Sequence, residues 1–171
     1  GPRNSHPEPP MSKFIATFGY VGLFPFAPGT AGSLAALPFG LALLALGGAS
    51  ALLAGAVFAF GLGWWATGAM TAGLADHDPS EIVIDELVGQ WIALLPMSFA
   101  AWNMGLNILD LWPGWIAAFA LFRFFDITKL GPIGWADRRG DPLGVMLDDV
   151  IAGVFAALGV VALAALYHGT A

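Results

Sequence analysis

Long runs of apolar residues dominate the chain, and short polar stretches separate them. Residues 14–75, 87–109 and 150–171 contain no Asp, Glu, Lys or Arg. A helix of about 20 apolar residues is long enough to cross a bilayer. The pattern therefore predicts helices that span a membrane rather than the buried core of a soluble protein.

Five apolar segments can be drawn, and each is long enough to be a transmembrane or re-entrant helix. They cover residues 31–47, 49–73, 80–101, 112–129 and 142–167. The Gly47-Gly48 pair predicts a tight turn between the first two segments. The aromatic, glycine-rich residues 12–26 are expected to lie along the membrane interface. The predicted fold is an all-α polytopic membrane bundle of about five helices.

The distribution of basic residues predicts the orientation of this bundle. With the N-terminus in the cytoplasm, Lys13 and the loop 130–141 face inward, and the latter carries Arg138 and Arg139. The outward loops near residue 48, at 102–111 and after 167 then contain no Lys or Arg. This arrangement follows the positive-inside rule, so we expect a cytoplasmic N-terminus.

Composition narrows the possible classes of protein. The chain is 58% hydrophobic and 11% charged, whereas soluble domains carry about 25% charged residues. It has no cysteine, which excludes disulfides and thiolate chemistry, and its net charge of -6 is not that of a nucleic-acid binder. Residues 1–10 are polar, proline-rich and precede Met11. We interpret them as a disordered tail outside a single membrane domain, residues 11–171.

An internal similarity links two acidic segments. Residues 78–90 (DPSEIVIDELVGQ) and 141–153 (DPLGVMLDDVIAG) align without a gap. Each begins with Asp-Pro, which predicts a helix N-cap followed by proline in the first turn. Seven and eight residues later come two adjacent carboxylates, Asp85-Glu86 in one segment and Asp148-Asp149 in the other. Small residues follow both pairs and would allow a close helix approach. A chance match between two short segments of biased composition is the alternative.

The acidic pairs need partners because they lie in apolar helices. A charge at the centre of a membrane costs about 2.5–3.5 kcal/mol on insertion scales. Both predicted helices run outward from the cytoplasm, so the two pairs can meet at one depth and share a divalent cation. Oxygen ligands without His or Cys suit Mg²⁺ or Mn²⁺. Glu81, one turn before Asp85, could join the ligands. A proton- or cation-coupled transporter or channel would also use buried carboxylates.

Basic residues accompany the acidic pairs in the segment F122-R-F-F-D-I-T-K129. Arg123, Asp126 and Lys129 recur at a spacing of three, which places them on one stripe of a helix. One interpretation is that the two cations extend to the interface and pair with Asp126. The other is a cationic wall for an anionic substrate, with Asp126 as metal ligand or base.

A glycine-containing loop, F24-P-F-A-P-G-T-A-G-S33, leads into the first apolar segment. Its position predicts a helix N-terminus at which Thr30 and Ser33 could assist in binding a phosphate. A simple turn before a helix explains the same residues. All these features fall on the predicted cytoplasmic side, where a cation, basic side chains and a helix terminus would suit phosphoryl transfer on a lipid phosphate.

Other phosphate chemistries fit the sequence poorly. The chain has three histidines, and they are not the paired active-site histidines that a histidine-nucleophile lipid phosphatase needs. It also lacks the P-loop lysine and the D-G-x-x-A-R run of the CDP-alcohol phosphotransferases. A scaffold without chemistry is a third possibility beside the enzyme and the transporter.

Four blocks together resemble the phosphatidylglycerophosphatase A family. They are L23-F-P-F-A-P-G-T-A-G-S-L34, I82-V-I-D-E-L-V-G89, F122-R-F-F-D-I-T-K129 and G144-V-M-L-D-D-V-I-A-G153. The resemblance implies a Mg²⁺-dependent enzyme of the bacterial inner membrane. It would hydrolyse phosphatidylglycerophosphate to phosphatidylglycerol and phosphate on the cytoplasmic side.

We assign hypothetical roles to eleven residues on this basis. The expected metal ligands are Asp85, Glu86, Asp148 and Asp149. Asp126, Asp149 and Glu81 are the candidates for a catalytic ligand or base. The expected substrate-binding residues are Thr30, Ser33, Arg123, Lys129 and Arg138. Direct attack by water ranks before an aspartyl-phosphate intermediate.

Overall fold

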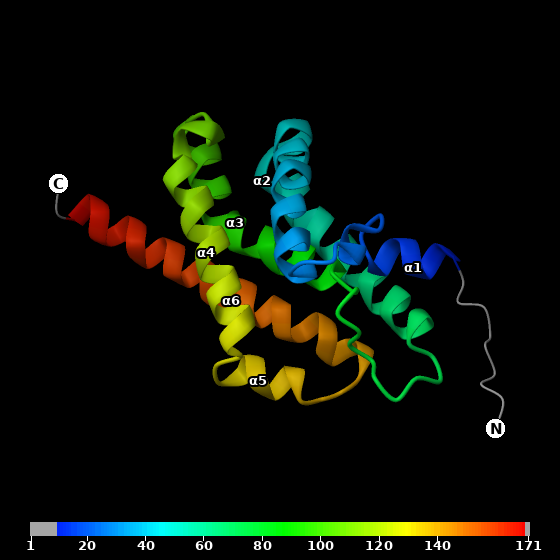
Figure 1. The fold of residues 1–171 in the computed structure, drawn as a ribbon. Helices are drawn as coiled ribbons and strands as arrows, with labels where there is room; N and C mark the ends of the chain where they lie inside the picture. Colours follow the sequence, from blue (N-terminus) through cyan, green and yellow to red (C-terminus); the bar gives the residue numbers. More distant parts are fainter. Residues whose placement is uncertain (1–9, 170–171) are drawn as a thin grey trace, which may run out of the picture.

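Helices form the regular structure of residues 10–169, the part of the chain that the computed structural model describes (Figure 1). In chain order they are α1 (Pro10–Ala16), the 3-10 turn η1 (Val21–Leu23), α2 (Pro28–Met70), α3 (Ile84–Met104), the 3-10 turn η2 (Ile108–Leu111), α4 (Trp112–Thr128), α5 (Pro132–Asp137) and α6 (Pro142–Gly169). The all-α prediction is confirmed for these residues. The expected tail, residues 1–10, lies outside the described residues except for Pro10.

Helix α2 reverses its direction at the predicted glycine pair. Gly47 has φ -157° and ψ 22°, and Gly48 has φ 63° and ψ -156°, so neither is helical. The positive φ of Gly48 favours glycine, and an added Cβ there would collide with the ring of Trp102. After the turn the two halves pack together, and Leu43 lies against Gly55. The predicted boundary between the first two apolar segments is therefore correct.

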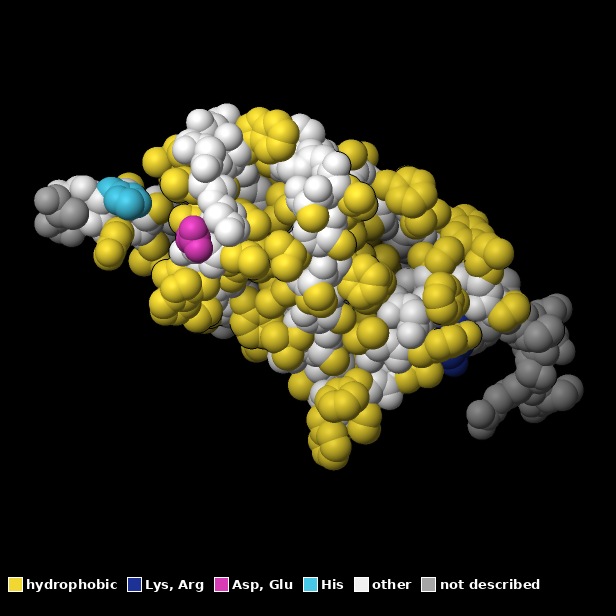
Figure 2. Space-filling model, turned by 90° about the horizontal axis from the view of Figure 1, so that it is seen from above, with side chains coloured by type: hydrophobic (Ala, Val, Ile, Leu, Met, Phe, Trp, Pro, Cys, Tyr) yellow, Lys and Arg dark blue, Asp and Glu magenta, His cyan; other side chains and the backbone are white. Residues whose placement is uncertain are grey.

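Three helical stretches are long and apolar enough to cross a membrane by length and composition. They are Pro28–Met70, Ile108–Thr128 and Pro142–Gly169. Their outward side chains are large and apolar, as in Leu46, Phe58 and Leu166. Figure 2 shows a face covered by hydrophobic side chains, on which acidic and basic groups are nearly absent. Such surfaces are typical of contact with lipid.

The segment before α2 packs against the start of α3. Residues 12–26 form most of α1, a tight turn and η1 rather than one longer helix. The Val83 N–H donates to the Ala16 carbonyl at 2.9 Å. Gly22 lies so close to the Glu81 carbonyl that a side chain there would have no room. These contacts hold residues 81–83 in a non-helical conformation.

The predicted start of α3 at Asp78-Pro79 is therefore wrong. Helix α3 begins at Ile84, and Val83 at its N-cap makes no side-chain cap hydrogen bond. The backbone contacts of residues 81–83 outweigh the local Asp-Pro signal. Asp85 and Glu86 consequently lie in the first turn of α3, where the helix dipole favours negative charge.

The equivalent prediction for α6 is confirmed. Asp141 precedes Pro142 and accepts a hydrogen bond from the Gly144 N–H at 2.8 Å. Arg139 binds the same carboxylate, and both contacts hold the pKa of Asp141 below its usual range. Asp148 and Asp149 then lie two turns along α6, as the spacing from Asp141 predicts.

Helices α3 and α6 cross at the small residues that follow the acidic pairs. A Cβ added to Gly153 would lie 2.5 Å from the Gly89 carbonyl oxygen, and one added to Gly89 would lie 2.6 Å from the Asp149 carbonyl oxygen. The predicted close approach is confirmed. It brings the N-terminal turn of α3 against the second turn of α6.

Candidate functional site

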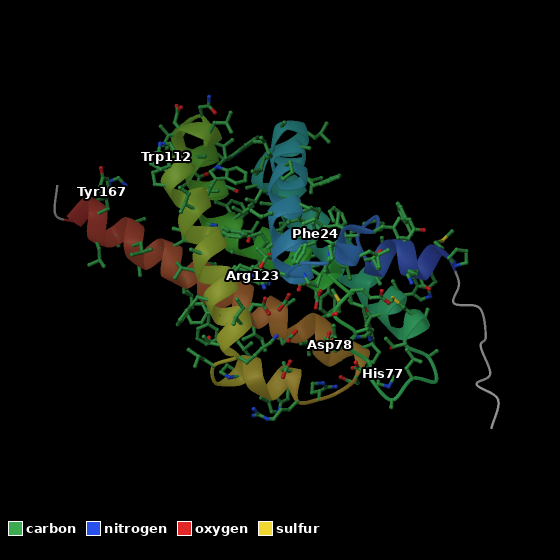
Figure 3. The ribbon with its side chains drawn as sticks, viewed as in Figure 1. Phe24, His77, Asp78, Trp112, Arg123 and Tyr167 are labelled. Carbon is green, nitrogen blue, oxygen red and sulfur yellow. The ribbon has the colours of Figure 1, made fainter. Side chains whose placement is uncertain are left out.

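A charged cavity lies where the start of α2, the segment before α3, the end of α4 and the first half of α6 meet. Its volume is about 380 Å³. The lining residues are Ala27, Pro28, Gly29, Asp78, Ser80, Ile82, Asp85, Glu86, Arg123, Asp126, Ile127, Lys129, Asp148 and Asp149. Figure 3 shows Arg123 near the centre of the molecule and Asp78 below it, both away from Trp112 and Tyr167.

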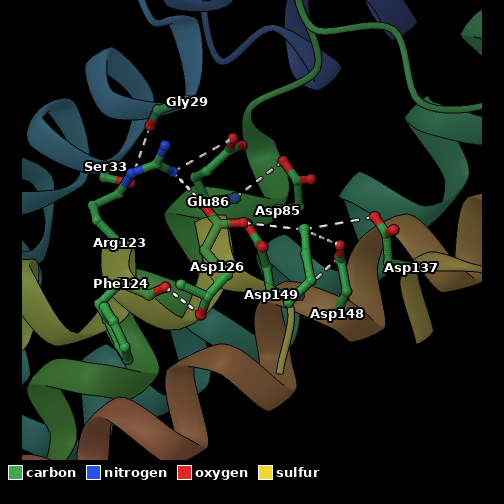
Figure 4. Close-up of polar contacts among 12 residues, drawn as sticks. Gly29, Ser33, Asp85, Glu86, Arg123, Phe124, Asp126, Asp137, Asp148 and Asp149 are labelled. Atoms are coloured by element: carbon green, nitrogen blue, oxygen red, sulfur yellow. Dashed lines mark hydrogen bonds and ion pairs between the residues drawn. The ribbon is translucent and has the colours of Figure 1, made fainter. Parts of the chain in front are cut away.

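Carboxylates from three helices converge in this cavity (Figure 4). Asp85, Asp148 and Asp149 form one group whose oxygens all lie within 4.8 Å of one another. Glu86, Asp126 and Asp149 form a second group by the same measure. Asp149 belongs to both groups, so five carboxylates make one continuous acidic cluster. The predicted meeting of the two acidic pairs is confirmed.

The internal similarity is visible in the local geometry of the pairs. Asp85 Oδ1 accepts the Glu86 N–H at 3.0 Å, and Asp148 Oδ1 accepts the Asp149 N–H at 2.8 Å. The pairs meet at one level, and the glycines that follow them meet again further along both helices. Helices α3 and α6 are therefore parallel at the crossing, as the sequence predicts.

Two oxygens of the acidic cluster are buried without a hydrogen-bond partner. They are Asp149 Oδ2 and Glu86 Oε2. Asp149 is only 1% exposed, so water does not compensate for the missing partner. A buried carboxylate oxygen in this state is costly unless a cation or proton binds it. Both residues belong to the groups that could hold a metal ion.

Two cations border the acidic cluster. Arg123 hydrogen-bonds Asp126 and lies 4.0 Å from Glu86. Lys129 bonds Asp126 at 3.1 Å and also contacts Asp148. The cations thus pair with Asp126 and also line the cavity, while the binding of an anionic substrate by them stays a prediction.

The charge of Lys129 is well supported by its surroundings. This residue caps the C-terminus of α4 in the left-handed conformation, with φ 49°. Burial alone would lower the pKa of its ammonium group, but Asp149, Asp148 and Asp126 outweigh that effect and raise the pKa. These carboxylates therefore favour the positively charged form of Lys129 at the wall of the cavity.

The start of α2 reaches the cavity with its backbone. Gly29 lies in the first turn, and an added Cβ would collide with Glu86 and lie 3.1 Å from Arg123. Ser33 donates its hydroxyl hydrogen to the Gly29 carbonyl at 3.0 Å, so it holds this turn rather than lining the cavity. Thr30 does not line the cavity either. The first N–H groups of a helix remain free for an anion.

Two further predicted site residues, Glu81 and Arg138, lie outside the cavity lining. Glu81 is in the non-helical segment before α3, where its carboxylate lies 4.0 Å from the Lys13 ammonium. The expectation that Glu81 lies one helical turn before Asp85 is wrong, because α3 begins later. Arg138 is exposed at the end of α5.

Asp78 and Ser80 line the cavity, although the sequence prediction did not assign them to the site. Asp78 was expected to cap a helix, so its place in the cavity lining was not predicted. Desolvation raises the pKa of the Asp78 carboxyl, and the nearby Lys129 partly offsets this effect. The signal that could have identified it is the DHD run at 76–78, which ends seven residues before Asp85.

A known protein family matches most of the chain. The family model described as phosphatidylglycerophosphatase A matches residues 14–164. A phosphatidylglycerophosphatase A of Haemophilus influenzae is 40% identical over 90% of this chain and 88% of its own length. The Escherichia coli protein of the same name is 35% identical over 80% of this chain and 73% of its own.

A third relative has a different name. A putative phosphatidylinositol-3-phosphatase of Bacteroides thetaiotaomicron is 44% identical over 78% of this chain and 81% of its own length. No solved structure matches the chain at a significant level.

Proposed function

The chain belongs to the phosphatidylglycerophosphatase A family, a family of phosphatases, and from this membership we propose its substrate, metal and location. It removes the terminal phosphate of phosphatidylglycerophosphate in a Mg²⁺-dependent reaction, and Mn²⁺ can substitute. The reaction takes place at the cytoplasmic face of the bacterial inner membrane. The products are phosphatidylglycerol and inorganic phosphate.

The observation that carries this proposal is the acidic cluster with its two unpartnered buried oxygens, Asp149 Oδ2 and Glu86 Oε2. Hard carboxylate oxygens in such a group fit Mg²⁺. Asp85, Asp148 and Asp149 would hold one ion, and Glu86, Asp126 and Asp149 would hold a second or complete the first. Bound Mg²⁺ would offset the phosphate's negative charge and make a water molecule a better nucleophile.

The residues around the cluster have complementary tasks. Lys129 and Arg123 face the cavity and bind non-bridging phosphate oxygens through charge-assisted hydrogen bonds. The backbone at Gly29 places the positive end of α2 beside them. Asp126 holds both cations in position and is a candidate base. The head group bends into this cavity from the side of the membrane, where the acyl chains lie.

Phosphate release from phosphatidylglycerophosphate in mixed micelles tests the proposal. We expect Asp149→Asn to lower the rate more than about 100-fold, since even the outer partners of a metal are worth 10–100-fold. Asp110→Asn is the matched control, because Asp110 lies in η2 and does not line the cavity. Chelation of divalent ions should stop turnover, and added Mg²⁺ should restore it.

Two outcomes would overturn parts of this assignment. Full activity in chelator would show that the reaction needs no divalent metal. The cation- or proton-coupled transporter would then be considered again, and an ion-flux assay in proteoliposomes would test it. Faster hydrolysis of phosphatidylinositol 3-phosphate would instead favour the activity named for the Bacteroides relative. The acidic cluster would serve either phosphate monoester, so the substrates must be compared side by side.

A further inference from the structure

An apolar groove lies on the other side of the loop that closes the charged cavity. Its volume is about 440 Å³, and it is lined by Tyr20, Val21, Leu23, Phe24, Pro25 and Ala31. None of these side chains is charged. Tyr20, Leu23 and Phe24 are each about half exposed although they are large. Figure 3 shows Phe24 beside the start of α2.

The groove and the cavity share one short piece of backbone. Pro25 borders the groove and Ala27 borders the cavity. Two residues of extended chain span at most about 7 Å, so the two linings are close neighbours. Ala31 continues the groove along α2, and Gly29 one half-turn earlier belongs to the cavity. A ligand that passes over residues 25–29 would place a phosphate end in the cavity and an apolar end in the groove.

The loop that separates them is held in a defined conformation. Tyr20 and Ala27 have positive φ values of 70° and 46°, which non-glycine residues rarely adopt. Gly22 packs on the Glu81 carbonyl, and the Phe24 N–H donates to the Val21 carbonyl at 3.0 Å. The groove is therefore a preformed surface. It packs against residues 81–83, which lead directly into α3.

We propose that this groove seats the first part of an acyl chain of the lipid substrate while its phosphate occupies the charged cavity. The inference rests on the proposed lipid phosphatase function and adds residues that select the substrate by its apolar end. The occupant is the substrate's own chain because the groove is uncharged, has half-exposed apolar walls and is lined by residues that neighbour the cavity lining in the chain.

A series of water-soluble substrates with the same head group tests the proposal. The substrates carry two short acyl chains of four to seven carbons and are kept below the concentration at which they form micelles. Each methylene that enters the groove from water should raise kcat/KM by up to about fourfold. If kcat/KM of the wild-type protein does not change with chain length, the proposal is overturned. A bulk lipid or a second copy of the chain would then be the candidate occupant of the groove.

Filling the groove gives the second arm of the test. Ala31→Phe should flatten the dependence on chain length while the four-carbon substrate keeps its rate within about twofold. Ala42→Phe is the control, because Ala42 lies on the same face of α2 about three turns further on and is exposed. Leu23→Ser should also reduce the slope, which covers the case in which Ala31→Phe fails to fold.

The outcomes separate the two proposals. If no substrate in the series releases phosphate from the wild-type protein, the proposed function fails. If the short substrate is cleaved but Ala31→Phe and Leu23→Ser keep the wild-type slope, the groove assignment fails. An equal loss at every chain length would show that the substitutions disturb the phosphate cavity, and that result would also overturn the groove assignment.

Discussion

Asp149 is the residue on which the site depends most, because it belongs to both carboxylate groups. Its side chain lies deeper than the others, and one oxygen has no hydrogen-bond partner. Its carbonyl oxygen also touches the narrowest point of the α3–α6 crossing. A change at Asp149 is therefore expected to affect the charge of the cluster, the proposed metal binding and the helix packing together, whereas changes at the rim separate these effects.

Glu81 and Glu86 allow a matched comparison of a rim residue and a cluster residue. Glu86→Gln should lower phosphate release at least about 10-fold, because it removes a charge from the second carboxylate group. Glu81→Gln should change the rate less than about threefold. Its contact with Lys13 is a part-exposed pair at 4.0 Å, which contributes little. The measurement is kcat/KM at saturating Mg²⁺.

Equal losses in these two variants would contradict the structure, because they would mean that Glu81 reaches the site. Circular dichroism of both variants in detergent is the control for folding. The sequence alone assigns Glu81 to the ligands by its spacing from Asp85, and this reasoning holds only if residues 81–85 are helical. Residues 81–83 are not helical in the structure, because α3 begins at Ile84, so this reasoning does not apply.

At the scale of whole helices, the close crossing of α3 and α6 determines the depth of the acidic cluster. Gly89 and Gly153 bring the two backbones together, and both acidic pairs lie immediately N-terminal to this contact. Without the glycines the helices would separate, and the oxygens within 4.8 Å of one another would move apart. The small residues are thus as necessary to the site as the carboxylates.

Gly89→Ala should destabilise the protein and reduce its activity. The new Cβ would lie 2.6 Å from the Asp149 carbonyl oxygen, and overpacking of this kind costs about 1–3 kcal/mol. Thermal unfolding in detergent and phosphate release measure the two effects. Gly61→Ala is the control, because nothing lies within 4 Å of the added Cβ and alanine favours the helix. A Gly89→Ala protein as stable as the Gly61→Ala protein would contradict this account.

The Asp-Pro motif predicts the start of α6 correctly and the start of α3 incorrectly, because the tertiary contacts at the two positions differ. At Asp141 nothing competes with the cap, so the carboxylate accepts the Gly144 N–H and α6 begins as predicted. At Asp78 the segment that follows bonds to Ala16 through Val83 and packs under Gly22. Those partners are distant in the sequence, so the local sequence around Asp78 does not predict these contacts.

The same limit applies to the site. The sequence identifies Asp85, Glu86, Asp148 and Asp149 because a charge inside an apolar helix is conspicuous. It cannot place Asp78 or Ser80, which reach the cavity only because the segment before α3 is not helical. The groove beside the cavity is likewise invisible in sequence, since its residues resemble any other apolar stretch.

At the scale of the whole molecule, the charges gather at one end of the bundle. The cavity, α5 and the loop before α6 lie toward the lower side in Figure 3, and Trp112 lies at the opposite end of α4. Arg138 and Arg139 lie in this lower region beside the site. The positive-inside rule then predicts that the cavity lies on the cytoplasmic side, where a newly made lipid phosphate would be accessible.

Single cysteines labelled from each side of the membrane test this orientation and the number of spans. The chain has no cysteine of its own, so each introduced thiol is unique. Ser50→Cys follows the reversal of α2, and Asn103→Cys lies in the last turn of α3; both positions are exposed. A membrane-impermeant maleimide should label both in spheroplasts, because five spans with a cytoplasmic N-terminus place them outside.

Ala75→Cys is the counterpart on the other side. Ala75 is exposed in the segment between α2 and α3, close to the residues that line the cavity. The reagent should reach it only in inverted vesicles. The reverse pattern at all three positions would invert the bundle and place the phosphatase site outside. Labelling of Ser50→Cys from the same side as Ala75→Cys would instead show that the two halves of α2 form a re-entrant hairpin. The site would then be held from one face of the bilayer by a hairpin rather than by two complete spans.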